Sequence, residues 1–166
     1  KRMSTLNQSL LMLSKIENQQ FKDKEEVVFN DVVKTMISDF SSILEFKSIE
    51  LDLIENGEFK TIINKDLAYS LLSNLFKNAI KHNTNNGKII IELDNHSLKI
   101  KNNSNRKTPL NSRDIFNRFY KESGDQLSTG LGLSIVKTIV DHHSNMNIYY
   151  DFEDPFHIFS LKNKNS

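Results

Sequence analysis

One stretch of the chain, residues 71–83 with the sequence LLSNLFKNAIKHN, constrains the fold more than any other. Wound as an α-helix at about 100° per residue, it gathers its large apolar side chains on one face. That face consists of Leu72, Leu75, Phe76, Ala79 and Ile80. Its border carries Asn74, Asn78, Lys81 and His82, and the side expected to face solvent carries Ser70, Ser73 and Lys77. The pattern predicts a core helix with two asparagines at the edge of its buried face.

These two asparagines need hydrogen-bond partners, because burying an unpaired carboxamide costs free energy. An amide oxygen can ligate a hard cation and the amide nitrogen can donate to phosphate. Asn74, Asn78 and Lys81, about one turn apart, would therefore suit a metal-bound polyphosphate. Alternatively, the asparagines bond to neighbouring backbone and Lys81 is solvated. The helix by itself leaves both interpretations open.

A second stretch, residues 128–140 with the sequence STGLGLSIVKTIV, leads from Ser128, Thr129 and Gly130 into an apolar helix pattern. Glycines let the backbone approach a phosphate closely, and the free N–H groups at a helix N-terminus attract anions. A loop that simply enters a core helix would have the same pattern. This motif alone is weak support for a phosphate site.

Together, in this order and spacing, the two stretches resemble the ATP-binding catalytic domain of sensor histidine kinases, in the GHKL ATPase superfamily. Residues 73–82 (SNLFKNAIKH) resemble its N box, residues 115–121 (IFNRFYK) its F box and residues 128–137 (STGLGLSIVK) its G2 box. Residues 13–21 (LSKIENQQF) are similar to the end of the dimerisation helix before that domain. Four segments in one order, over almost the whole chain, are far more specific than any one of them.

The resemblance implies a two-layer α/β sandwich of the Bergerat ATP-binding type, in which a mixed sheet packs on three helices and a long helix precedes the domain. Residues 1–22 would be the C-terminal part of the dimerisation and histidine-phosphotransfer region. Residues 27–163 would be the catalytic domain, and its ATP lid would span about residues 103–128.

The resemblance also implies a Mg-ATP site. Asn74 and Asn78 would ligate Mg²⁺, Lys81 would bind phosphate, and Asn78 and Lys81 would be the catalytic residues, because phosphoryl transfer needs mainly positioning and charge neutralisation. The full expected nucleotide-binding set is Asn74, Asn78, Lys81, His82, Asn102, Ser104, Phe116, Phe119, Ser128, Thr129, Gly130, Leu131, Gly132 and Leu133.

The chain departs from the family where an aspartate and a glycine normally bind the adenine. Asn102 and Ser104 occupy this region, so a neutral amide replaces the carboxylate that accepts from the adenine amine. Its hydrogen bond is worth roughly 1 kcal/mol less than a charge-assisted one. A carboxamide can also turn over and donate, which predicts relaxed selectivity for the base. Ser128 replaces the first G2 glycine, and His82 stands where the family often has an aromatic residue.

Composition limits the other possibilities. The 166 residues suit one compact domain plus an appendage, and a net charge of +1 with 26% charged residues suggests neither a nucleic-acid surface nor a membrane-binding face. The absence of cysteine excludes disulfides and fits a reducing compartment, so we expect a cytoplasmic location. No apolar run could span a bilayer. We expect a soluble fragment of a longer protein that an upstream part could anchor in the inner membrane.

The remaining elements follow from local patterns. Met3, Leu6, Leu10 and Leu13 form the seam of a helix that either dimerises or folds onto its own domain. A charged hinge at 22–26 precedes a strand at 27–29 and a helix through Leu44, capped by Asn30 or Asp31. Hairpins are predicted for 49–63, 88–101 and 146–161. Asp66 would cap the N-box helix, and the lid would hold one short helical piece.

The sequence thus predicts the ATP-binding catalytic part of a two-component sensor histidine kinase. It would pass the γ-phosphoryl group of ATP to a histidine on an upstream helix, for relay to a response-regulator receiver domain, in a protein that dimerises through its helical hairpin. None of the five histidines here fits the acceptor, so we do not expect the fragment to label itself. The alternatives are a scaffolding pseudokinase and an anti-sigma-type GHKL serine kinase.

Overall fold

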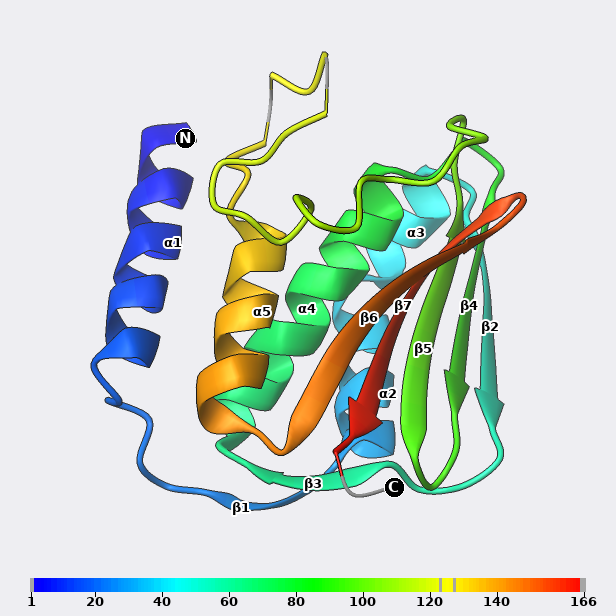
Figure 1. The fold of residues 1–166 in the computed structure, drawn as a ribbon. Coiled ribbons are helices and arrows are strands. Elements are labelled where there is room, and N and C mark those ends of the chain that lie inside the picture. Colours follow the sequence, from blue (N-terminus) through cyan, green and yellow to red (C-terminus); the bar gives the residue numbers. More distant parts are fainter. Residues whose placement is uncertain (1, 123, 127, 165–166) are drawn as a thin grey trace.

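A mixed five-stranded sheet carries the domain (Figure 1). The structure is a computed structural model that describes residues 2–122, 124–126 and 128–164. The strand order is β2-β4-β5-β7-β6, with β2 parallel to β4 and the other neighbours antiparallel. The strands are β2 (Glu50–Glu55), β4 (Lys88–Leu93), β5 (Ser97–Asn103), β6 (Met146–Glu153) and β7 (Phe156–Asn163).

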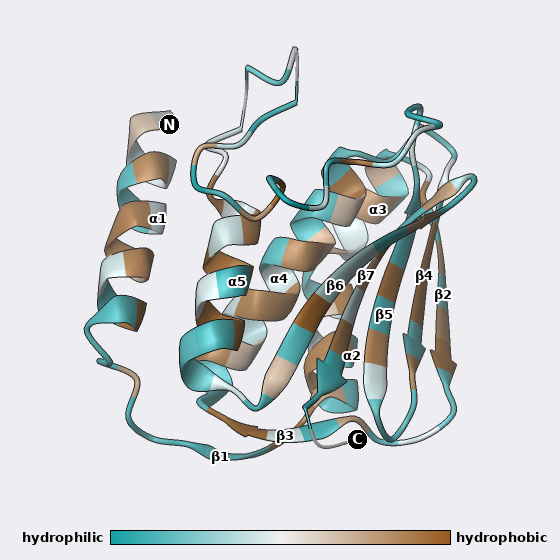
Figure 2. Cartoon of the chain, viewed as in Figure 1, coloured by the Kyte–Doolittle hydropathy of each residue, from teal (hydrophilic) through white to brown (hydrophobic). Residues whose placement is uncertain are grey.

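Three helices cover one face of this sheet: α2 (Phe29–Asp39), α4 (Lys65–Lys81) and α5 (Gly132–His143) (Figure 1). A short helix, α3 (Ser41–Phe46), follows α2. In β4 and β5, buried and partly exposed residues alternate, so each of these strands turns one row of side chains toward the helices; hydropathy alternates in the same way along β5 (Figure 2). In β4 this buried row is Ile89, Ile91 and Leu93. The predicted two-layer sandwich of a mixed sheet and three helices is confirmed.

Helix α4 is the central core helix, as residues 71–83 predict. All five residues of its expected apolar face are buried. Ser73, which we expected to face solvent, is also buried, and its hydroxyl donates to the Ser70 carbonyl at 3.1 Å. The N-cap is Asn64, whose side chain accepts from the Asp66 and Leu67 N–H groups, so the prediction of Asp66 as cap was wrong by two residues.

The predicted hairpin at 49–63 is wrong, although both of its strands exist. β2 pairs with β4, whereas β3 (Lys60–Ile63) pairs with β1 (Glu25–Val28) in a separate two-stranded sheet. Asn30 explains the divergence, because its buried carboxamide donates to Glu55 and to the Gly57 carbonyl and accepts from the Phe59 N–H. These bonds hold the Asn-Gly turn against α2 and direct the chain away from β2.

Asn30 is consequently not a helix cap. Helix α2 begins at Phe29, after Val28, with no side-chain cap, and it ends at Asp39, so the single helix predicted through Leu44 is two helices separated at Phe40. β1 starts at Glu25, inside the expected hinge. The predicted hairpins at 88–101 and 146–161 are confirmed as β4–β5 and β6–β7.

Helix α1 (Arg2–Glu17) precedes the domain and lies along α5, on the side away from the sheet (Figure 1). Leu13 and Ile16 are buried in this contact, while Met3 and Leu10 stay exposed. The His143 ring nitrogen Nε2 is hydrogen-bonded to the Ile16 carbonyl at 2.8 Å. The second half of the predicted seam therefore packs on its own domain. No helix in the described part of the chain is long and apolar enough for a membrane span.

Candidate functional site

A cleft of about 680 Å³ opens between α1, α4, the N-terminus of α5, the sheet and described residues between 104 and 131. Eleven of the residues expected to bind nucleotide line it: Asn74, Asn78, Lys81, His82, Asn102, Ser104, Ser128, Thr129, Gly130, Gly132 and Leu133. Three others do not. Leu131 is buried, Phe116 packs edge-on against the cleft residue Phe159 at 6.2 Å between ring centroids, and Phe119 is 57% exposed.

Part of the cleft wall comes from the predicted lid. We expected one short helix in the lid, but its described residues form no helix. Turns replace it; for example, the Ile115 N–H donates to the Asn111 carbonyl at 3.1 Å. Ile115 is buried and anchors these turns on the core, and Phe119 has a positive φ of 61°. Of the three aromatic residues of the F box, Phe116 packs beside the cleft, Phe119 is exposed and Tyr120 lines the cleft.

Asn74 and Asn78 keep amide groups available on the cleft side of α4. The Asn74 nitrogen donates to the Ser70 carbonyl at 2.8 Å, which leaves its oxygen as an acceptor. The Asn78 side chain is half-buried and makes no hydrogen bond among the residues that the structure describes. Two amide oxygens are a suitable donor set for a hard cation such as Mg²⁺. The described residues contain no cluster of three acidic, histidine or cysteine ligands, so phosphate and water would complete the coordination.

Helix α5 meets the cleft with an open N-terminus. Leu131 precedes its first residue and no side chain caps it, so its first N–H groups can receive an anion. Gly130 has a φ of +71°, and a β-carbon there would lie 2.8 Å from backbone atoms of Phe119. The glycine is thus required by the left-handed turn and by the close packing of the lid, in addition to any approach of phosphate.

Lys81 forms an ion pair with Asp125, which lies in the second half of the lid. The same carboxylate accepts from the Ser128 N–H at 3.2 Å and from its hydroxyl at 2.7 Å. Partial burial raises the pKa of the Asp125 carboxyl, but the Lys81 ammonium and the Ser128 hydrogen bonds outweigh it and lower that pKa to about 2. Burial, reinforced by Lys81, lowers the pKa of His82, which favours a neutral imidazole at the cleft.

Asn102 lies at the floor of the cleft, nearly fully buried in β5. Its amide nitrogen donates to the Asn103 carbonyl at 2.8 Å. On the neighbouring strand β7, His157 is its direct partner in the ladder and also lines the cleft. Ser104, at the rim, accepts from the Arg106 N–H at 3.1 Å.

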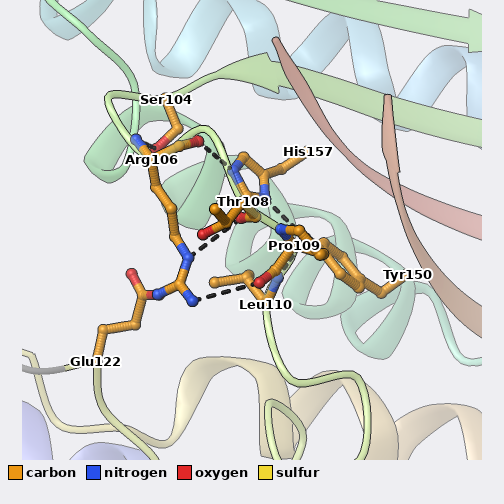
Figure 3. Close-up of polar contacts among 8 residues, drawn as sticks. All are labelled: Ser104, Arg106, Thr108, Pro109, Leu110, Glu122, Tyr150 and His157. Carbon is orange, nitrogen blue, oxygen red and sulfur yellow. Dashed lines mark hydrogen bonds and ion pairs between the residues drawn. The ribbon is translucent and has the colours of Figure 1, made fainter. Parts of the chain in front are cut away.

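A network that the sequence did not predict fixes the first half of the lid to the sheet (Figure 3). His157 bonds the Arg106 carbonyl through Nε2 at 3.1 Å and the Tyr150 hydroxyl through Nδ1 at 2.8 Å. That hydroxyl accepts from the Leu110 N–H at 2.9 Å. His157 therefore has a structural role. A strand over residues 156–161 places His157 on the same face as Phe159 and Leu161, and this period of two was the local signal for its burial.

Arg106 ties this wall together from the cleft side (Figure 3). Its guanidinium donates to the carbonyls of Thr108 at 3.2 Å and Pro109 at 3.3 Å and pairs with Glu122. The Arg106–Glu122 ion pair therefore joins the two halves of the lid, and the Lys81–Asp125 ion pair ties the second half to α4. The site is a cleft with cations at its rim, amides on one wall and an open helix N-terminus on the other.

Comparison with known proteins identifies this arrangement. A model of the family described as "Histidine kinase-, DNA gyrase B-, and HSP90-like ATPase" matches residues 63–162, which is more than half of the chain. The chain belongs to this family. As a histidine kinase-, DNA gyrase B- and HSP90-like ATPase domain, it is an ATP-binding domain.

Its relatives narrow the type of domain within this ATPase family. The chain is 31% identical over 155 residues to the heme sensor protein HssS of Staphylococcus saprophyticus, covering 88% of the chain and 33% of that protein. It is 34% identical over 148 residues to HssS of Staphylococcus aureus strain Newman, covering 85% of the chain and 32% of that protein. The chain thus spans about a third of the length of the curated relatives it matches.

Solved structures of histidine kinases have the same fold. The Acinetobacter baumannii histidine kinase AdeS superposes with a TM-score of 0.74 at 24% identity, covering 96% of the chain and 77% of the AdeS chain. The catalytic domain of the histidine kinase ThkA superposes with a TM-score of 0.73 at 23% identity, covering 85% of the chain and 95% of the ThkA chain. The chain is the ATP-binding catalytic part of a sensor histidine kinase, and the comparisons lend no support to the pseudokinase or serine-kinase alternatives.

Proposed function

We propose that the domain binds Mg-ATP in this cleft and transfers the γ-phosphoryl group to a histidine on an upstream helix of the longer protein. The observation that supports this most is the uncommitted Asn78 carboxamide, which faces the same cleft as the Lys81 ammonium and the open N-terminus of α5. Amide oxygen, cation and helix N–H groups are the three kinds of group that a metal-bound triphosphate requires.

Each group has a distinct role in this proposal. Asn102 accepts from the adenine amine, Asn74 and Asn78 hold Mg²⁺ through their oxygens, and Lys81 with the first N–H groups of α5 binds phosphate. When bound, the ion neutralises charge on the phosphate oxygens. The residues of the chain orient the γ-phosphoryl group and exclude water, and no nucleophile within the chain is needed, because phosphoryl transfer depends mainly on positioning and electrostatics.

The partners in this proposal lie outside the chain. ThkA has been solved in complex with the response regulator protein TrrA, which supports a response-regulator receiver domain as the later recipient of the phosphoryl group here. The exposed Met3, Leu10 and Leu11 on α1 suit the helical interface of a homodimer. We propose that the domain works in the cytoplasm.

Radiolabelled ATP tests this function. The chain is mixed with a purified fragment that carries the upstream helix, and acid-labile label is expected on a histidine of that fragment. The chain alone should remain unlabelled. Label on His142 or His143 of the chain would contradict the assignment of the acceptor, and ATP binding without any transfer to the upstream helix would contradict the kinase reaction.

A further inference from the structure

The Asp125 carboxylate already occupies an anion site inside the cleft. It pairs with the Lys81 ammonium and accepts from both the N–H and the hydroxyl of Ser128, at 3.2 Å and 2.7 Å. Only 15% of the Asp125 side chain is exposed. One carboxylate thus engages three donors from two segments, the end of α4 and the approach to α5.

These donors are the ones that a phosphate group would use. Carboxylate and phosphate are both anions that offer only acceptor oxygens, and both favour an ammonium group together with backbone N–H groups near a helix N-terminus. In a partly buried site, two anions close to one ammonium repel each other more strongly than in water. Asp125 and a phosphate group therefore cannot both hold Lys81 and Ser128 without a large penalty.

We propose that Asp125 is an internal substitute for phosphate, which ties the lid to Lys81 in the nucleotide-free cleft and which the phosphates of a ligand must displace. This inference rests on the proposed nucleotide-binding function. A ligand binds Lys81 and Ser128 only if its phosphates reach these residues and displace the Asp125 carboxylate. Adenosine cannot do so, and ADP and ATP can. Asp125 is thus a specificity-determining residue that weakens the binding of ligands with phosphates and leaves the binding of phosphate-free ligands unaffected.

The chain provides a matched comparison in Glu122. It belongs to the same part of the lid, where the Asp125 N–H donates to the Glu122 carbonyl at 3.1 Å, and it also pairs with a cation at the cleft. Its partner Arg106, however, is fixed to the opposite wall by the Thr108 and Pro109 carbonyls. Removing the Glu122 charge loosens the lid without freeing Lys81 or Ser128.

Calorimetric binding of adenosine, AMP, Mg-ADP and Mg-ATP to wild type, Asp125→Asn and Glu122→Gln tests the inference. Asp125→Asn should tighten ADP and ATP by about three- to tenfold, the strength of a partly exposed charge-assisted contact. It should leave adenosine unchanged, so the ratio of adenosine to ATP dissociation constants rises. Glu122→Gln can change all four constants, but by a common factor.

The inference would be overturned by weaker ATP binding in Asp125→Asn, by equal tightening of adenosine and ATP, or by the same change of ratio in Glu122→Gln. Hydrogen exchange without nucleotide gives an independent readout, since Asp125→Asn should speed exchange around Ser128, and unchanged exchange also overturns it. Absence of ATP binding in wild type and both variants would instead contradict the proposed function. ATP binding by wild type with an unaltered Asp125→Asn would leave that function intact and refute only the role of Asp125.

Discussion

The side-chain oxygen of Asn74 lies 3.3 Å from the position that a β-carbon on Gly132 would occupy. This proximity links the two motifs that the sequence singled out, one on α4 and one at the start of α5. Gly132 therefore leaves room for the Asn74 carboxamide at the point where metal and phosphate would meet. Any side chain at position 132 must move that amide, which gives the glycine a role that helix geometry alone does not require.

Gly132→Ala should weaken Mg-ATP binding without lowering the melting temperature. Alanine stabilises a helix by up to about 1 kcal/mol over glycine, so the thermal stability should not fall. The Asn74 oxygen, however, would be displaced from the position in which it can bind the metal. Calorimetry and thermal unfolding on the same preparation separate the two effects. Wild-type affinity in this variant would mean that the position of Asn74 does not matter for binding.

Gly130→Ala should behave differently, although the sequence motif makes the two glycines look alike. A non-glycine residue in the left-handed region costs about 1–2 kcal/mol, and the β-carbon would also meet the Phe119 backbone at 2.8 Å. We expect lower thermal stability together with weaker binding. A variant as stable as wild type would show that the lid can shift to accept the extra carbon.

Asn78→Ala should abolish measurable Mg-ATP binding and leave the melting temperature within a degree or two, because its amide contributes no hydrogen bond to the described fold. Asn74→Ala should weaken binding less, since water can replace its oxygen. The matched control is Asn147→Ala on the edge strand β6, outside the cleft. An unchanged dissociation constant in Asn78→Ala would exclude it as a metal ligand.

The local part of this site could be predicted from the sequence, and the part made by distant strands could not. Helical periodicity places Asn74, Asn78 and Lys81 together because it depends only on neighbouring residues. The partners of β2 and β3 depend on long-range pairing, so the Asn-Gly turn at residues 56 and 57 suggested a hairpin that does not form. Propensity and pattern do not encode which strands become neighbours.

The same reasoning explains why the lid contacts were missed. His157 enters the cleft only because β7 lies beside β5, and Tyr150 reaches it from β6. Asp125 lies in a polar stretch without periodicity, where a carboxylate close to a lysine 44 residues away leaves no local signal. The sequence therefore brought together the residues that we expect to bind phosphate, while the contacts that close the lid required the structure.

Tyr150→Phe tests the anchor of the lid. Removing the hydroxyl leaves the Leu110 N–H and the His157 Nδ1 without their partner, which costs about 1–3 kcal/mol. We expect a lower free energy of unfolding in denaturant titration and weaker ATP binding. Tyr149→Phe is the control, because Tyr149 is its neighbour and is 48% exposed. Equal stability of both variants would show that the network does not hold the lid.

The Asp125 ion pair predicts a pH dependence of stability. Its pKa is about 2 in the folded protein against an ordinary value of 3.8, so the folded state holds the carboxylate more strongly. That contribution is complete above the ordinary value and is lost as the pH falls toward 2, by at most about 2 kcal/mol. The free energy of unfolding of wild type should therefore fall toward that of Asp125→Asn over this acid range. Parallel pH profiles for the two proteins would contradict the pairing.

Base selectivity depends on which way the Asn102 carboxamide faces. Its nitrogen donates to the Asn103 carbonyl at 2.8 Å, and a carbonyl only accepts, so a reversed amide would bring two oxygens together. Oδ1 is therefore the atom left for a ligand. The sequence predicted relaxed selectivity because a carboxamide can turn over, and this hydrogen bond prevents that rotation. The neutral amide can then act as an acceptor, as the carboxylate of the family does.

We therefore expect wild type to bind ATP about tenfold or more tightly than GTP, a difference of about 1.4 kcal/mol, because Oδ1 accepts from the adenine amine and repels the guanine carbonyl. Asn102→Asp keeps the acceptor, so the selectivity for ATP over GTP should persist. It loses the hydrogen bond to the Asn103 carbonyl and places a charge at a nearly buried position, so the melting temperature should fall. Asn102→Ala should bind both nucleotides alike. Calorimetry with ATP and GTP on all three proteins tests this prediction. If the ratio of the GTP to the ATP dissociation constant is the same in all three, Asn102 does not contact the base.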